Sequence, residues 1–210
     1  MKERFDTVSR FDSAYETHTA PWVIGEPQPA VVALERSGVL RSPILDIGCG
    51  LGEHSILLTR LGYQVLGIDF APHAVAQARA NAAARGVDAH FEVGNAFDLD
   101  AATTYDTILD SALFHIFDDA DRARYVESLR RVCRPGGYLH LLALSDAGRG
   151  FGPQVSEQAI RSAFADGWDL EALERTTYRG VVGEAHAEPL GLPAGTVVDE
   201  PAWLARVRRV

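Results

Sequence analysis

The chain has 210 residues, of which 47% are hydrophobic and 23% charged, and its formal net charge is −9. This length fits one domain with a sizeable core, and the composition is that of an ordinary globular protein. Because the chain is acidic and only the short terminal run RVRR is rich in arginine, we expect no nucleic-acid partner.

No segment has the apolar run of a secretory signal or of a membrane span, so we expect a cytosolic protein without a membrane partner. Two cysteines, Cys49 and Cys133, are too few for a disulfide framework, and no Cys and His spacing resembles a zinc site. We therefore expect reduced thiols and no metal.

The middle of the chain alternates short apolar runs with helical patterns. The apolar runs predict strands at 43–48, 64–69, 89–95, 105–110 and 138–145. The patterns between them predict helices at 53–62, 72–86 and 118–133. Strands that alternate with helices in this way predict an α/β fold with a parallel, doubly wound sheet.

Beyond Ser145 the rhythm changes. The stretch SEQAIRSAFADG predicts a helix with Ser156 as its N-cap, and strands are expected at 168–178 and in the terminal run AWLARVRRV. The segment between these strands, 180–201, contains many Gly and Pro residues. An antiparallel hairpin added to the parallel sheet would account for both strands.

The stretch LDIGCGLGEH places Gly48, Gly50 and Gly52 directly after the first predicted strand. Glycines allow a tight turn and a close approach of ligand, and the carboxyl edge of a parallel sheet is where such folds bind ligands. A simple tight turn is the alternative. The dinucleotide fingerprint needs glycine where this chain has Glu53, and a glutamate at a helix start would repel a pyrophosphate, so NAD and FAD are disfavoured.

Asp69 ends the second predicted strand, at the place where nucleotide-binding folds use a carboxylate to accept both hydroxyls of a ribose. A cap or a surface charge is the alternative. The expected ligand therefore carries an adenosine-type ribose and no phosphate.

Five stretches carry a family resemblance: LDIGCGLGEHS, GIDFAPHAVAQARANA, VGNAFDL, YDTILDSALFHIF and LRRVCRPGGYLHLL. In their order and spacing they resemble the class I S-adenosylmethionine-dependent methyltransferases, over residues 20 to 180. The resemblance implies a Rossmann-like sheet of seven strands in the order 3-2-1-4-5-7-6, with strand 7 antiparallel. It also implies one domain, 1–210, with an N-terminal helical lid (1–40), a cofactor-binding core (41–145) and substrate-side strands and loops (146–210).

The resemblance implies S-adenosylmethionine as cofactor and S-adenosylhomocysteine as product. The methionine moiety would lie over the turn formed by Gly48, Cys49 and Gly50. Asp46 would lie near its ammonium group, directly or through water. Capping or surface charge is the alternative for Asp46.

On the nucleoside side, the resemblance places the ribose on Asp69 and the adenine against Phe70. Family members normally show GDA after the third strand, where this chain has GNA with Asn95 and Ala96. The amide oxygen of Asn95 can still accept a hydrogen bond from the adenine amino group. Asp110 would end the fourth strand beside the cofactor.

The stretch APWVIGEPQPAVVALERSG resembles the lid of small-molecule methyltransferases related to thiol, halide and thiopurine enzymes and to actinobacterial enzymes that methylate heterocyclic toxins and hydroxyquinolones. In those relatives the segment folds over the cofactor and its tryptophan lines the site, which places Trp22 against cofactor and acceptor. The relatives often show PWDIG, whereas this chain has Val23 in place of the acid. A core anchor is the alternative for Trp22.

The loop after the fourth strand, DSALFHIFDD, is expected to form the other wall of the acceptor site. Phe114 and Phe117 would suit a flat aromatic acceptor, or else pack in the core. His115, with a pKa near neutrality, would act as base for a phenol or N-hydroxy proton, or else be structural. Further candidates for the acceptor site are Tyr15, His18, Phe151 and His186.

These expectations describe methyl transfer in line from a sulfonium to an O or N nucleophile of a small aromatic or heterocyclic molecule. The alternative within the enzyme class is S-methylation or halide methylation in detoxification. The alternative outside it is a cofactor-binding domain without turnover. A nicotinamide oxidoreductase is disfavoured by Glu53, and a protein or nucleic-acid methyltransferase by the small size and acidic charge.

Overall fold

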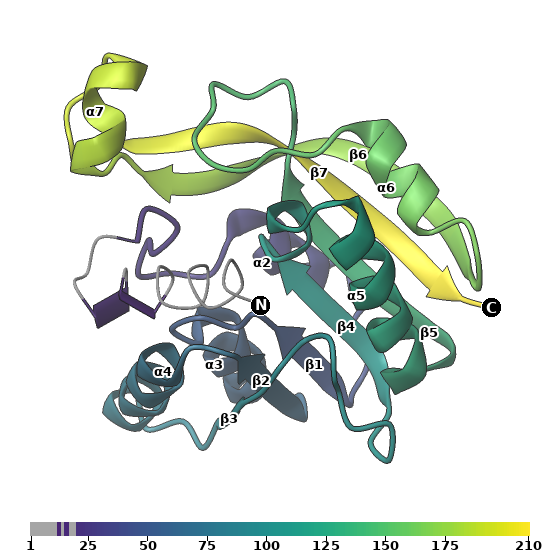
Figure 1. Ribbon diagram of the computed structural model, residues 1–210. Helices are drawn as coiled ribbons and strands as arrows, with labels where there is room; N and C mark the ends of the chain where they lie inside the picture. Colours follow the sequence, from purple (N-terminus) through teal and green to yellow (C-terminus); the bar gives the residue numbers. More distant parts are fainter. Residues whose placement is uncertain (1–11, 14, 17–19) are drawn as a thin grey trace.

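The structure, a computed structural model, describes residues 12, 13, 15, 16 and 20–210 (Figure 1). It contains a seven-stranded sheet in the order β3-β2-β1-β4-β5-β7-β6. The first five strands pair in parallel, and β7 runs antiparallel to both β5 and β6. The predicted strand order and the antiparallel seventh strand are confirmed.

The strands are β1 (Ile44–Ile47), β2 (Val65–Asp69), β3 (His90–Val93), β4 (Tyr105–Ser111), β5 (Cys133–Leu144), β6 (Trp168–Val181) and β7 (Val197–Arg209). The helices are α2 (Pro29–Arg36), α3 (Glu53–Arg60), α4 (Pro72–Ala84), α5 (Asp119–Val132), α6 (Glu157–Ala163) and α7 (Glu184–Leu190), and the 3-10 turn η1 (Phe114–Ile116) follows β4. Each strand and helix that the sequence predicts is present within a few residues of its expected bounds.

Helices cover both faces of the sheet. In Figure 1, α5 and α6 lie in front of it, over the main core to which Ile108 and Leu139 belong. The next residue of β4, Leu109, points to the other face, where it packs with Val31 of α2 and Leu58 of α3. Strands covered on both faces bury every side chain, which explains why these segments are continuous apolar runs.

The helix starts follow from local sequence. The Ser156 side chain accepts a hydrogen bond from the Ala159 N–H at 3.1 Å, which confirms the predicted N-cap of α6. Asp118 caps α5 in the same way, through the Asp121 N–H at 2.8 Å. Pro72 is the first residue of α4, where its missing N–H costs no hydrogen bond.

Two segments differ from the prediction. β5 begins at Cys133 instead of 138, because the RPGG residues continue the strand through an irregular pairing with β4. The helix α7 lies inside 180–201, where Gly and Pro gave no helical pattern. Its N-cap Gly183 provides no side-chain cap and Pro189 lies within it, so its position depends on Ala187 and Leu190, which pack on a small core.

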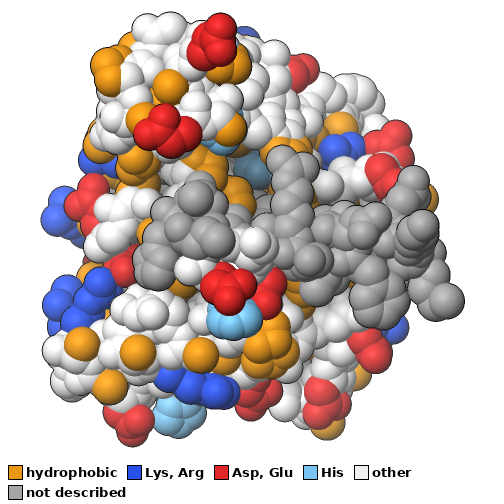
Figure 2. Space-filling model, turned by 60° about the vertical axis from the view of Figure 1, so that its left-hand side comes forward, with side chains coloured by type: hydrophobic (Ala, Val, Ile, Leu, Met, Phe, Trp, Pro, Cys, Tyr) orange, Lys and Arg blue, Asp and Glu red, His pale blue; other side chains and the backbone are white. Residues whose placement is uncertain are grey.

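The surface carries both signs of charge. On the face that Figure 2 shows, acidic and basic side chains occur side by side. Within the described part of the chain, no helix combines the length and the apolar character that crossing a membrane requires.

Candidate functional site

The loop between β1 and α3 makes the tight turn that its glycines predict. Gly48, Gly50 and Gly52 have φ values of 72°, 53° and 83°, a region that residues with a Cβ rarely adopt. A Cβ on Gly52 would lie 2.6 Å from the ring of Phe91 inside the fold. A Cβ on Gly50 would instead lie 2.9 Å from the hydroxyl of Tyr15, on the outer side of the turn. Gly50 is therefore the glycine at which a group approaches the backbone on the outer side of the turn and not from inside the fold.

A pocket of about 70 Å³ lies on this outer side of the turn. Its described lining comes from Tyr15, from residues 20–28, which we call the roof segment, from the glycine turn with the start of α3, and from the ends of β4 and β6. The pocket thus lies at the carboxyl edge of the sheet, where the sequence predicts the ligand.

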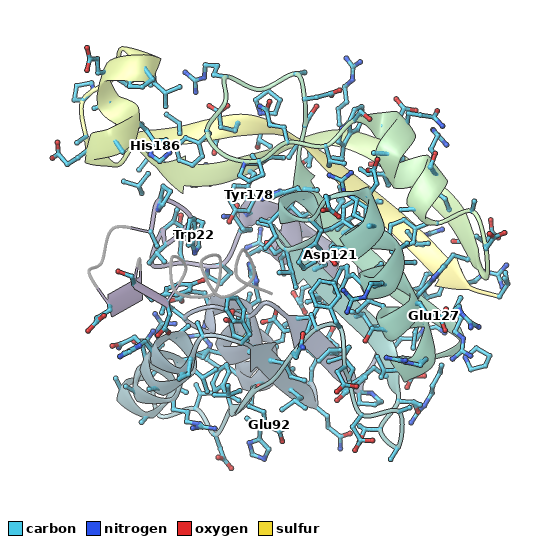
Figure 3. The ribbon with its side chains drawn as sticks, viewed as in Figure 1. Trp22, Glu92, Asp121, Glu127, Tyr178 and His186 are labelled. Carbon is cyan, nitrogen blue, oxygen red and sulfur yellow. The ribbon has the colours of Figure 1, made fainter. Side chains whose placement is uncertain are left out.

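Aromatic side chains form one wall of the pocket. Trp22 of the roof segment donates from Nε1 to the Tyr15 hydroxyl at 2.9 Å, and the two rings meet edge to face with centroids 5.8 Å apart. Tyr178 of β6 is buried and packs in the same cluster as Trp22, and Figure 3 shows the two near each other. The structure brings Trp22 and Tyr15, both predicted for the acceptor site, into contact at this pocket, and their contact with an acceptor stays a prediction. Sequence reasoning missed Tyr178, because nothing in the β6 pattern distinguishes it from a core residue.

Asp69 lies at the end of β2 and is bound to the glycine turn. One carboxylate oxygen accepts from the Gly50 N–H and the other from the Ala71 N–H, both at 2.9 Å. Burial raises the pKa of Asp69, and these backbone donors oppose that rise. The Phe70 N–H is a further backbone donor, and the carboxylate keeps acceptor capacity for a ribose hydroxyl. The contacts of Asp69 and of the next residue, Phe70, with a ribose and an adenine stay predictions.

Asp46 is 1% exposed and is surrounded by the first turn of α3. Its Oδ2 accepts from the Ser55 hydroxyl at 2.7 Å, and its Oδ1 lies 4.0 Å from Nδ1 of His54. His54 lines the pocket, and its Nε2 accepts from the Gln28 N–H at 3.1 Å. Sequence reasoning missed His54 and Gln28. The contact of Asp46 with an ammonium group stays a prediction.

Asn95 follows β3 and is exposed, with Ala96 beside it partly buried. Its amide oxygen accepts from the Phe97 N–H at 3.0 Å, closing a local turn. The second lone pair of that oxygen remains for an adenine amino group, which stays a prediction.

The expectation that Asp110 lies beside the cofactor needs correction. Its carboxylate points to the α5 face, where it accepts from the N–H groups of Leu113 and Phe114 and from the Tyr125 hydroxyl at 2.8 Å. Burial raises its pKa to about 6. The next residue, Ser111, lines the pocket instead, and its buried hydroxyl has no hydrogen-bond partner among the described residues. Strand alternation explains the difference.

The two phenylalanines of the loop after β4 belong to the core. Phe114 is 0% exposed and stacks on Phe164 with centroids 5.6 Å apart. Phe117 packs against Phe97 and Tyr125, with centroids 4.9 Å and 5.0 Å away. The predicted aromatic wall is therefore not at these positions, because η1 turns both rings toward α5 and α6.

His115 is buried, and its Nδ1 accepts from the Leu144 N–H at 2.9 Å. Burial and the charge of Arg122 lower its pKa to about 4, so the prediction of a pKa near neutrality is wrong. Because Nδ1 accepts, the neutral ring carries its proton on Nε2. The ring is therefore a hydrogen-bond donor, and the geometry does not favour the role of base.

Two of the remaining candidates for the acceptor site, Phe151 and His186, lie together under α7. Phe151 is 4% exposed and packs on the backbone of Gly180, in a small core under α7. His186 stacks on it with centroids 5.4 Å apart, and Figure 3 shows His186 on the α7 side, away from the glycine turn. His18 lies outside the described residues.

The pocket suits a nucleoside ligand without phosphate. Gly50 leaves space that a Cβ would fill, and Ser111 offers an unpartnered hydroxyl. Asp69 does not line the pocket itself but accepts from the N–H of Gly50, which does. No arginine or lysine occurs among the described residues that line the pocket. These features fit S-adenosylmethionine, whose ribose and ammonium groups are donors.

Comparison with known proteins also indicates a methyltransferase. Residues 44–137 match the family model of a methyltransferase domain. The chain is 33% identical over 164 residues to a 2-heptyl-1-hydroxyquinolin-4(1H)-one methyltransferase of Mycobacteroides abscessus, covering 73% of this chain and 70% of that protein.

Solved structures with the same fold are known. One, described as "Conversion of a Disulfide Bond into a Thioacetal Group during Echinomycin Biosynthesis", is 36% identical, has a TM-score of 0.86, and is matched over 96% of this chain and 91% of that one. A magnesium protoporphyrin IX methyltransferase from Synechocystis, with bound S-adenosylmethionine, is 19% identical with a TM-score of 0.64, over 86% of this chain and 76% of that one. The second likeness concerns the fold alone.

Proposed function

Because the chain belongs to the class I S-adenosylmethionine-dependent methyltransferases, we propose that its acceptor is an O or N atom of a small aromatic or heterocyclic molecule. The methyl donor of the family is S-adenosylmethionine, and the product is S-adenosylhomocysteine.

One observation carries the proposal: the pocket is walled by aromatic side chains directly across from the glycine turn. Trp22 and Tyr15 come from the N-terminal part of the chain, and Tyr178 comes from β6. Rings of this kind bury a flat apolar molecule well and still offer a polar edge. The hydroxyquinolone acceptor in the name of the 33% identical relative agrees with this reading.

Separate residues would hold the two ligands. In the proposal Asp69 binds the ribose, and the Gly48 to Gly50 turn lets the methionine part approach the backbone. The Ser111 hydroxyl, unpartnered among the described residues at the end of β4, would face the methionine part of the cofactor. When bound, S-adenosylmethionine supplies an electrophilic methyl group. The aromatic wall excludes water from that group, which favours a step that removes charge.

In the proposal His115 does not act as a general base. The Nδ1 of His115 is occupied by the Leu144 N–H, and Nε2 holds the proton. The acceptor would therefore present a lone pair or an atom that has already lost its proton.

A second candidate function is methylation of a sulfur nucleophile. It is supported by the 36% identical structure, whose description concerns conversion of a disulfide bond into a thioacetal group. A thiolate also needs no base at the moment of transfer.

The proposal is tested with methyl-deuterated S-adenosylmethionine and a panel of phenols, N-hydroxyquinolones, azaheterocycles and thiols. Mass spectrometry then identifies any labelled product. We expect labelled O- or N-methyl products from the aromatic part of the panel, and none with an Asp69→Ala control. Labelled thioethers alone would favour the second candidate. No product, together with calorimetric binding of S-adenosylhomocysteine, would contradict both.

A further inference from the structure

The roof segment is fastened to β6 at both of its ends. Near its start, the Pro21 carbonyl accepts from the Val181 N–H at 2.8 Å. At its end, the Gln28 side chain pairs with the backbone of Arg179: Nε2 donates to the carbonyl at 2.8 Å, and Oε1 accepts from the N–H at 2.9 Å. Gln28 is 3% exposed, so these bonds lie out of water.

A fourth hydrogen bond joins the roof segment to the opposite side of the pocket. The Gln28 N–H donates to Nε2 of His54 at 3.1 Å. His54 is the second residue of α3, directly after the glycine turn, and its side chain is 13% exposed. One buried glutamine therefore contacts β6 with its side chain and the cofactor side with its backbone.

The other nitrogen of His54 faces a carboxylate. Because Nε2 accepts, the proton of the neutral ring is on Nδ1, which lies 4.0 Å from Asp46 Oδ1. Burial lowers the pKa of His54, against the opposing charges of Asp46 and Glu53, so the ring is neutral at pH 7. The Gln28 N–H thus fixes the tautomer, and the protonated Nδ1 faces the carboxylate of Asp46.

We propose that His54 is a positioning residue that holds the roof segment, and with it Trp22, over the glycine turn. It acts through Gln28 and does not touch the reacting atoms. The inference deepens the proposed function, because it assumes that this pocket is where the acceptor binds. A merely structural histidine would contribute to stability without this directed contact.

The test compares three substitutions of His54. His54→Leu keeps the bulk and removes the acceptor, and His54→Asn keeps a group near Nδ1 but does not reach Gln28. His54→Gln places an amide oxygen close to the position of Nε2 and restores the acceptor. His90→Gln, an exposed histidine at the start of β3, is the matched control.

The first readout is hydrogen exchange of the backbone amides of Gln28, Arg179 and Val181, with no acceptor present. We expect exchange about tenfold faster in His54→Leu and His54→Asn, the size of effect expected for one buried hydrogen bond, and wild-type exchange in His54→Gln and His90→Gln. Calorimetry measures S-adenosylhomocysteine affinity beside it; because His54 lines the pocket, wild-type affinity is expected only of the control His90→Gln.

The second readout is kinetic. With an acceptor from the panel, we expect KM for the acceptor to rise about tenfold in His54→Leu while kcat changes less, because the roof is mispositioned before the chemical step. Unchanged exchange in both His54→Leu and His54→Asn, or failure of His54→Gln to restore it, would overturn the inference. If the panel yields no product but the exchange pattern is found, the proposed function fails and the role of His54 stands.

Discussion

Ser111 and Asp110 are neighbours on β4 whose side chains lie on opposite faces of the sheet. The carboxylate of Asp110 lies on the α5 face, where it accepts hydrogen bonds from three donors. The Ser111 hydroxyl faces the pocket instead. A motif that ends in Asp-Ser predicts a polar group at this edge. The alternation of side chains along the strand determines which of the two residues faces the pocket.

Asp69 gives the most direct prediction at this scale. Replacing Asp69 by Asn keeps the shape but removes the charge and one acceptor, so affinity for S-adenosylhomocysteine should fall about 10- to 100-fold, as expected for hydrogen bonds to a charged group. Isothermal titration calorimetry measures the change. Asp88→Asn, at an exposed position before β3, is the control. Wild-type affinity in Asp69→Asn would exclude Asp69 from the cofactor site.

His115 gives a second prediction. His115→Asn retains an acceptor for the Leu144 N–H and removes Nε2. Because Nδ1 already accepts a hydrogen bond and the pKa is about 4, the dependence of kcat on pH should keep its shape from about pH 6 to about pH 9. Initial rates with an acceptor from the panel measure it. A limb of the profile that disappears in the variant would restore His115 as a base.

How much of the site the sequence predicts depends on what fixes each residue. The place of Gly50 in a tight turn and of Asp69 at a strand end was predictable, because backbone geometry and the strand pattern determine both. Phe114 and Phe117 were misplaced, since a short 3-10 turn decides which way their rings point and no periodicity encodes it. His54 was missed because its partner, Gln28, is distant in sequence and meets it only in the folded chain.

At the scale of elements, β6 and β7 form a long hairpin that supplies Tyr178 and anchors the roof segment. Gly180 lies in β6 where the Phe151 ring covers its backbone and the Pro21 carbonyl lies 3.2 Å from the position of a Cβ. The glycine therefore lets the loop after β5 and the roof segment meet on the same strand.

Adding a methyl group at Gly180 tests this meeting point. Gly180→Ala should lower the free energy of unfolding by about 1–3 kcal/mol, because the new Cβ overlaps the Phe151 ring. Urea unfolding measures the change. Gly152→Ala is the control, since its Cβ would make only an ordinary contact, 3.5 Å from Leu144. Equal midpoints for the two variants would contradict the packing argument.

The elements also show where sequence patterns suffice. The five core strands and the hairpin were predictable because each is a long apolar or alternating run between turn residues. The helix α7 was not, because it has seven residues, an internal proline and no capping side chain. It forms where Ala187 and Leu190 find apolar partners, which is a tertiary cause.

At the scale of the whole molecule, buried histidines determine the response to acid. His115 and His140 are both buried, and burial lowers both pKa values to about 4. Neither ring nitrogen of His140 has a hydrogen-bond partner among the described residues. Since unfolding lets both rings bind protons at their ordinary pKa, stability is full above about pH 6.5 and is lost as the pH falls toward 4.

Asp110 acts in the opposite sense. Its pKa of about 6 in the folded chain means that the folded state binds its proton first, so acid stabilises through this group. His54, whose pKa is also lowered, and Asp69, whose pKa is raised, act in opposite senses to each other. The balance therefore rests on His115 and His140 against Asp110, with a net uptake of about one proton on unfolding. We expect the free energy of unfolding to fall by about 1.4 kcal/mol per unit between pH 6 and pH 4.

Urea unfolding at several pH values measures this slope, and His140→Leu tests its origin. The variant removes one titrating ring, so the slope over this range should largely vanish. Stability at neutral pH should rise by about 1–3 kcal/mol, because two unsatisfied nitrogens are removed. A slope that persists unchanged in His140→Leu would show that other groups determine the acid response.

The closeness of Tyr15 to Gly50 has a consequence for the order of events. A pocket of about 70 Å³ is much smaller than the roughly 300–1,000 Å³ of sites that enclose a drug-sized ligand. In the proposed function, a nucleoside would therefore enter only after the Tyr15 ring has left the turn, and it would depart by the same route. The residence time of the spent donor would then be governed by the departure of one phenol ring.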